Sequence, residues 1–319
     1  MARETVRQSG PYRGPVIDFH THLTLHWEVL PDQPRQRDPR KPDPWAPALR
    51  WLVWKTYERL RYQNFIRRRS PLEAPLEHIL NRVIRSFHRE ESEDLLQRMD
   101  QAGVSQAVVL AAPPVVPNEA VLAGGAKSER LLPFISPCPD APPEPQIERL
   151  LAAGGRGIKV HPLLQHVKVD SEYVTRVARL AAAKRVPLII HAGGSNRLFG
   201  LGAGFRTDPV EFARLARRVP GASLVVAHSG LWEWPEILRE VIPFQNLILD
   251  ISFQSPAALK QIKQAVPLHR LVLGSDSPMG NISIVMENCV LAGFTEHELR
   301  ALFWDNAQRL LAASRSEIR

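Results

Sequence analysis

PVIDFHTHL, residues 15–23, is a mostly apolar run that ends in two histidines separated by one residue. Similar apolar runs recur from residue 92 onward, and an amphipathic helical segment follows each of them. Near-continuous apolar strands are typical of parallel sheets that are covered on both faces. The later runs are QAVVLAA (106–112), LLPFISP (131–137), GIKVHP (157–162), PLIIHAG (187–193), SLVVAHSG (223–230), NLILDISF (246–253) and RLVLGSDSP (270–278).

Together with residues 15–23, these runs make eight strands that alternate with helices, which is the number that closes a (β/α)8 barrel. A doubly wound open sheet usually carries a glycine-rich phosphate turn after its first strand, whereas this first strand ends in histidines. Ser171 and Asp208 stand where helix N-caps belong. We therefore predict an α/β protein, a single TIM barrel over residues 1–319, with a last helix at 295–313 on the barrel exterior.

Residues 24–91 interrupt the repeat between the first strand and the helix at 92–103. This insertion begins proline-rich and charged, and it then predicts two helices, at 48–69 and 76–90. A loop after a barrel strand lies on the C-terminal face, where the active sites of barrels form. We expect the insertion to be a helical cap or lid over the barrel mouth. The alternative is that its helices mediate dimerisation, and a homodimer is expected.

The composition narrows the compartment and the ligand class. Only Cys138 and Cys289 occur, which excludes a disulfide framework and favours the cytoplasm. There is no run of eighteen apolar residues, so no membrane span is expected. The net charge of +8 is shared by many nucleic-acid-binding proteins, but no motif for nucleic acid accompanies it. Because the excess of basic residues is concentrated in 24–91, it favours an anionic small-molecule substrate or a subunit contact.

Polar residues that can perform chemistry end several of the predicted strands. His20 and His22 occupy positions i and i+2 of a strand, so both point into the barrel mouth. Imidazoles at this spacing suit Zn²⁺ and similar ions, and a hydrogen-bonded structural pair is the alternative. His191, His228 and Asp276 end three later strands and can converge above the barrel axis. This recurrence indicates one shared site rather than separate rim residues.

The motifs VIDFHTHL, GIKVHP, PLIIHAG, VVAHSG and LGSDSP resemble those of the amidohydrolase superfamily, in the branch that includes aminocarboxymuconate-semialdehyde decarboxylase. The resemblance covers residues 15–23 and 92–312 and leaves out 24–91. It implies that His228 polarises the substrate or moves a proton, and that Asp276 accepts a proton from a bound water. The metal ligands that it implies are His20, His22, His191 and Asp276.

Lys159 and His161 leave the number of metal ions open. They end the fourth strand two positions apart, on one face. In the binuclear branch of the superfamily, a carboxylated lysine on this strand bridges two metals, and His191 and His228 then match the ligands of the second ion. A buried ammonium paired with an acid is the alternative. We favour one divalent ion, Zn²⁺ before others, with His161 as a substrate contact or a residue behind the ligands.

These residues predict a metal-dependent hydrolase that acts on an amide, ester, lactone or related carbon centre. A non-oxidative decarboxylase of an aromatic or dienoic carboxylic acid shares the same ligands and is the nearest alternative. An inactive barrel that serves as a binding or scaffold protein is the alternative from another class. Arg197 and Arg206, after the fifth strand, and Trp232, after the sixth, are weaker candidates for substrate binding. Solvated loop residues are the other interpretation of the two arginines.

Overall fold

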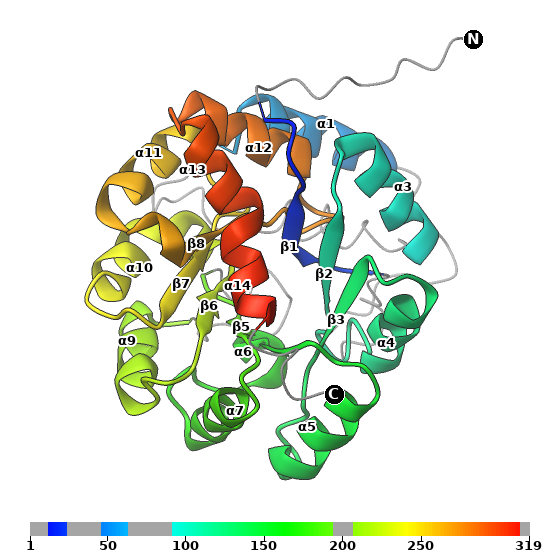
Figure 1. The fold of residues 1–319 in the computed structure, drawn as a ribbon, viewed down its shortest axis with the longest axis vertical. Helices are drawn as coiled ribbons and strands as arrows, with labels where there is room; N and C mark the ends of the chain where they lie inside the picture. The colour runs from blue at the N-terminus through cyan, green and yellow to red at the C-terminus, as the bar shows by residue number, and fades with distance from the viewer. Residues whose placement is uncertain (1–11, 24–45, 63–90, 194–206, 313–319) are drawn as a thin grey trace.

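The computed structural model describes residues 12–23, 46–62, 91–193 and 207–312. Its eight strands are parallel and follow one another around a nearly closed barrel in chain order, with helices outside them (Figure 1). The predicted TIM barrel is therefore confirmed. The strands are β1 (Ile17–Thr21), β2 (Gln106–Leu110), β3 (Leu131–Ile135), β4 (Gly157–Val160), β5 (Leu188–Ile190), β6 (Leu224–Val226), β7 (Leu247–Asp250) and β8 (Leu271–Val272).

Most of the helices form the outer ring, and two of them begin at the predicted caps. The side chain of Ser171 accepts a hydrogen bond from Val174 N–H, and that of Asp208 accepts one from Val210 N–H. None of the described helices is long and apolar enough to cross a membrane. They are α1 (Ala46–Arg59), α3 (Ser92–Ala102), α4 (Asn118–Lys127), α5 (Pro143–Ala152), α6 (Pro162–Gln165), α7 (Glu172–Ala183), α9 (Pro209–Arg218), α10 (Trp234–Val241), α11 (Pro256–Ala265), α12 (Ile282–Leu291), α13 (Glu296–Arg300) and α14 (Asn306–Ala312), with the shorter turns η2 (Ala227–Glu233), η3 (Leu268–Arg270) and η4 (Ala301–Asp305).

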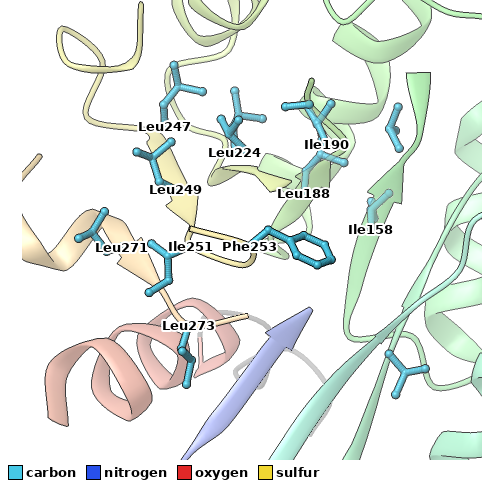
Figure 2. Close-up of a cluster of buried hydrophobic side chains, with 14 of the residues drawn as sticks. Ile158, Leu188, Ile190, Leu224, Leu247, Leu249, Ile251, Phe253, Leu271 and Leu273 are labelled. Carbon is cyan, nitrogen blue, oxygen red and sulfur yellow. The ribbon is translucent and has the colours of Figure 1, made fainter. Parts of the chain in front are cut away.

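Apolar side chains form one layer on the outer face of the barrel wall and another on its inner face. Outward-facing side chains pack beneath the helices, and Figure 2 shows part of this layer on β4 to β8, including Ile158, Leu224 and Leu271. Side chains that alternate with these face the barrel interior. The interior cluster includes Ile17, Phe19, Val108, Leu110, Phe134, Ile189, Val225, Ile248 and Val272.

The C-terminal helix closes one end of this interior. Rather than joining the outer ring as expected, α14 lies across the barrel (Figure 1). Its residues Ala307, Leu310 and Leu311 belong to the interior cluster. Asn306 fixes the helix by donating hydrogen bonds to the carbonyls of Leu268, in η3, and Leu271, at the start of β8. The bottom of the barrel is therefore filled with apolar side chains, and polar chemistry is left to the opposite, C-terminal end.

β1 meets the segment after β8, and this junction closes the barrel at the C-terminal end. Asp276 N–H donates a hydrogen bond to the His20 carbonyl at 2.8 Å, and His22 N–H donates one to the Ser277 carbonyl at 2.7 Å. Asp276 itself adopts a φ of 59°, in the left-handed region. The backbone thus holds the aspartate directly beside the two histidines of the first strand.

The described part of the insertion contains one helix. α1 ends at Arg59 rather than continuing to residue 69, so the predicted extent of 48–69 is wrong at its C-terminal end. Arg61 and Tyr62 have φ values of 50° and 58°, which no α-helix can accommodate. The second predicted helix, at 76–90, lies outside the described residues.

Candidate metal centre

His20, His22 and Asp276 form a buried cluster whose ligand atoms all lie within 4.8 Å of one another. His20 Nε2 lies 3.3 Å from His22 Nε2, and Asp276 Oδ1 lies 3.3 Å from each of these nitrogens. Ligands held tetrahedrally around zinc at about 2.0–2.1 Å are themselves about 3.3 Å apart. The triangle therefore has the dimensions of three ligand positions around a single ion.

A bulge in β1 aims both histidines inward. The pairing of β1 with β2 shifts register between Asp18 and Thr21, so the strand carries an extra residue there. Phe19 packs in the interior cluster, and strict alternation would turn His20 outward. With the bulge, Phe19 and His20 both face the interior and His22 follows two positions later.

The outer nitrogen of each imidazole has a fixed acceptor. His20 Nδ1 lies 2.6 Å from Asp250 Oδ2, and His22 Nδ1 lies 3.0 Å from the Leu110 carbonyl oxygen. A carbonyl or carboxylate oxygen places the proton on Nδ1, which leaves the Nε2 lone pair facing the cluster. Burial lowers the pKa of His22 and so favours the neutral ring that a metal requires.

Asp276 completes the triangle as an ionised carboxylate. Burial alone would raise the pKa of this group, but the neighbouring His20 and His22 hold it well below its ordinary value. Its Oδ1 accepts no hydrogen bond from the described residues. A buried carboxylate oxygen that faces two imidazole nitrogens is suited to a cation, since every cluster atom then has a partner.

Asp250 is a residue of this buried hydrogen-bond network that the sequence analysis missed. Its Oδ2 binds His20 and also accepts hydrogen bonds from His228 N–H at 2.8 Å and from the Ser252 hydroxyl at 2.9 Å. One side chain thereby connects β1, the turn after β6 and the end of β7. The available signal was its position, because Asp250 ends the apolar run NLILD just as His191 ends PLIIH.

Gly274 leaves the space that the Asp250 side chain occupies, because it has no side chain of its own. A Cβ at Gly274 would collide with the Asp250 carboxylate and with His20 Cβ. We therefore expect Gly274→Ala to lower the free energy of unfolding by about 1–3 kcal/mol, as overpacking does. Gly221→Ala is the matched control, because a Cβ there meets nothing within 4 Å. Denaturant unfolding of both variants checks this, and equal stability in the two would contradict it.

His191 and His228 lie together beside the triangle. His228 Nε2 is 3.1 Å from His191 Nδ1, and the ring of His161 stacks on that of His191 at 3.9 Å between centroids. Burial, with neighbouring charges, lowers the pKa of all three well below the ordinary value, so the rings are neutral. The structure thus brings these predicted residues to the site, although the mutually close ligand set within the described chain contains only His20, His22 and Asp276.

An unusual turn carries His228. Residues 228–231 all have positive φ, with values of 39°, 50°, 83° and 54°. Such backbone is strained for residues other than glycine and persists only when its surroundings hold it. Gln254 Nε2 donates a hydrogen bond to the His228 carbonyl at 2.8 Å, and buried Asn288 donates one to the Gln254 carbonyl at 3.0 Å. These amides hold the turn that presents His228 to His191.

Lys159 faces the interior of the barrel on β4. It pairs in register with Ile189 of the interior cluster, between outward-facing Ile158 and Val160. Its side chain is buried, and its Nζ makes no hydrogen bond to the described residues. Burial lowers the pKa of Lys159 to about 8, although the Asp276 carboxylate opposes this shift.

The described end of the insertion packs against the loops on the same face. Tyr62 accepts a hydrogen bond from Asn281 N–H at 2.9 Å, and its ring contacts Phe253 at 5.3 Å between centroids. Trp232 donates a hydrogen bond to the Tyr57 hydroxyl at 3.3 Å. Trp232 therefore has a packing contact with α1, and its predicted role toward substrate stays a prediction. Arg197 and Arg206 lie outside the described residues.

The family model of the amidohydrolases matches residues 17–312, which is nearly the whole chain. The chain belongs to the amidohydrolase family. This confirms the resemblance that the strand-end motifs indicated. A comparison with curated protein sequences finds no match.

Solved structures share the fold of this amidohydrolase at low sequence identity. An uncharacterised TIM-barrel protein from Bordetella bronchiseptica has a TM-score of 0.66 at 18% identity, covering 94% of this chain and 99% of its own. A 5-carboxyvanillate decarboxylase from Novosphingobium aromaticivorans, with bound manganese and 3-methoxy-4-hydroxy-5-nitrobenzoic acid, has a TM-score of 0.61 at 15% identity, and the match covers 96% of this chain and 98% of that one. A probable 2-pyrone-4,6-dicarboxylic acid hydrolase from Acinetobacter baumannii, with citric acid bound, has a TM-score of 0.57 at 13% identity, and the match covers 94% of this chain and 100% of that one.

Proposed function

We propose that this chain is a metal-dependent hydrolase acting on an amide, ester, lactone or related carbon centre. The observation that carries the proposal is the triangle of His20 Nε2, His22 Nε2 and Asp276 Oδ1, with 3.3 Å between its members. His191 is the proposed fourth ligand and Zn²⁺ the proposed ion. A barrel that had lost its chemistry would have no reason to keep this donor set buried and oriented.

The neighbouring residues supply the steps of hydrolysis. A divalent ion held here would lower the pKa of a bound water to about 7 and polarise a carbonyl oxygen. Asp276 accepts the proton of the attacking water, since its carboxylate stays ionised. If His191 binds metal through Nε2, its Nδ1–H donates to His228 Nε2, which places the His228 proton on Nδ1. That N–H has no hydrogen-bond partner among the described residues and can stabilise the oxyanion.

Non-oxidative decarboxylation is the second candidate reaction. It is supported by the fold shared with a 5-carboxyvanillate decarboxylase that carries manganese, while the fold shared with a probable 2-pyrone-4,6-dicarboxylic acid hydrolase supports hydrolysis. Turnover in ¹⁸O-labelled water separates the two. Hydrolysis places ¹⁸O in a product acid or alcohol, whereas decarboxylation releases CO₂ and adds no oxygen to the remaining product.

We also propose that the insertion, 24–91, covers the mouth of the barrel. The contacts of Tyr57 and Tyr62 with the loops after β6, β7 and β8 support this position. The side chains of Trp51 and Leu52 on α1 are 61% and 58% exposed. These apolar side chains support the additional proposal of a homodimer that uses α1.

Metal analysis tests the proposed centre. We expect one equivalent of divalent metal after reconstitution, nearly complete loss in His191→Ala and retention in His228→Ala. His269→Ala, which changes an exposed histidine, is the control. Elemental analysis that finds no metal in the wild type would exclude the proposed function. Equal losses in the His191 and His228 variants would instead indicate two ions.

A further inference from the structure

Lys159 occupies a distinctive place beside the cluster. Lys159 on β4 lies two residues before His161, and its pairing partner on β5, Ile189, lies two residues before His191. In each strand the two residues therefore face the same side. The His161 and His191 rings stack on each other. The lysine therefore lies at the border between the apolar barrel interior and these imidazole rings, and Asp276 is among its electrostatic neighbours.

The ammonium group lacks a dedicated partner in the described part of the chain. Lys159 is 1% exposed, and no described residue accepts a hydrogen bond from its Nζ. Of the two neighbouring carboxylates, Asp250 accepts hydrogen bonds from His20, His228 and Ser252, and Asp276 belongs to the cluster with His20 and His22. Buried cations are retained when something pairs with them. An anionic group that enters the site could therefore pair with the ammonium.

His161 follows Lys159 on the same face of β4. Its Nδ1 accepts a hydrogen bond from Leu164 N–H at 3.2 Å. An Nδ1 that accepts a hydrogen bond carries the lone pair of the ring, so the proton of His161 is on Nε2, and that atom is not a metal ligand. The end of β4 thus carries an ammonium and, two residues later, an imidazole N–H.

We infer that Lys159 binds a carboxylate of the substrate directly beside the metal centre. This inference rests on the proposed function, because it gives the substrate of that reaction an anionic group. A carboxylate carries one negative charge, which the single positive charge of the ammonium balances. A phosphate monoester carries a charge of about −1.5 to −2, which one ammonium leaves partly unbalanced. The substrate class is therefore a carboxylic acid whose reacting carbon lies close to the carboxylate.

Calorimetric titration of the zinc-loaded protein with benzoate and with benzamide tests the inference. The two probes have nearly the same shape and differ in charge. We expect the wild type to prefer benzoate, and Lys159→Met to weaken benzoate binding about tenfold or more while leaving benzamide unchanged. Lys168→Met is the matched control, since this lysine follows the same strand but is exposed, and it should bind both probes as the wild type does.

Several results would overturn the inference. One is equal binding of benzoate and benzamide to the wild type, a measurement that requires no variant. Another is unchanged benzoate binding in Lys159→Met, or in Lys159→Gln if the methionine variant does not fold. The third is a carbamate signal in ¹³C NMR of protein supplied with ¹³CO₂, together with loss of one of two metal ions from the variant. That result would make Lys159 a bridging ligand.

The failure of the proposed function is separately visible. A wild-type protein that takes up no metal would exclude the metal-dependent reaction, while its preference for benzoate over benzamide would still report on Lys159. Conversely, a protein with one zinc ion and no dependence of benzoate binding on Lys159 would keep the proposed reaction and remove the carboxylate site.

Discussion

Replacing Asp276 with asparagine is expected to lower kcat by about 10³-fold or more while the protein stays folded. The carboxylate has two tasks in the proposed reaction, since its Oδ1 faces the nitrogens of His20 and His22 and it accepts the proton of the attacking water. An amide keeps the shape of the side chain but is a weaker ligand and no base. Loss of a general base alone typically costs about 10²–10⁴-fold.

The measurement uses any ester, lactone or amide that the wild type hydrolyses in a substrate screen. Circular dichroism confirms folding, and elemental analysis gives the metal content of each variant. Asp305→Asn, which changes an exposed aspartate, is the control and should retain activity. Near-normal turnover in Asp276→Asn would show that Asp276 is neither a metal ligand nor the base, and the proposed mechanism would be wrong.

The sequence predicted the barrel and the position of the site because both follow from short periodic patterns. Apolar runs of four to six residues separated by helices specify parallel strands, and a polar residue at the end of such a run lies at the C-terminal face. His20, His22 and Asp276 were found in this way, and the structure brings them together. His191 and His228 also lie in contact with each other, and Lys159 faces the same barrel interior, while the roles of all three toward metal or substrate remain proposals.

Alternation alone would have given a wrong interior at β1. Phe19 and His20 are consecutive, yet both face the inside, because the register shifts between Asp18 and Thr21. A bulge of this kind depends on pairing with β2 and has no marker such as glycine in IDFHT. The sequence therefore predicted that His20 and His22 share a face, but not the extra residue that allows Phe19 to share it.

Long-range contacts explain the other differences. The bond between His20 and Asp250 joins residues 230 positions apart, so the position of Asp250 at a strand end could be read from the sequence but its contact with His20 could not. The end of α1 was missed for a related reason, since Arg61 and Tyr62 adopt positive φ without being glycine or asparagine. Asn288 holds this turn by donating a hydrogen bond to the Arg61 carbonyl at 3.3 Å. Tertiary contacts, rather than local preference, determine both features.

Asp250→Asn should weaken metal binding about 10–100-fold, although Asp250 does not touch the metal in the proposed centre. Loss of the carboxylate behind a ligating histidine typically has this effect. His20 Nδ1, His228 N–H and the Ser252 hydroxyl all approach Asp250 Oδ2, and the Ser252 N–H approaches Oδ1. An asparagine has one acceptor oxygen and one NH₂ group, so in either orientation the NH₂ faces a donor.

Competition with a zinc chelator measures the metal affinity, and thermal unfolding of the metal-free protein measures stability. Ser252→Ala separates the two effects, because it removes one hydrogen bond to Asp250 and keeps the contact with His20. We expect it to lower stability by about 1 kcal/mol and to leave zinc affinity nearly unchanged. Asp140→Asn, at an exposed position, should change neither. If Asp250→Asn binds zinc as tightly as the wild type, Asp250 does not orient His20 as a ligand and serves only to join β1, β6 and β7.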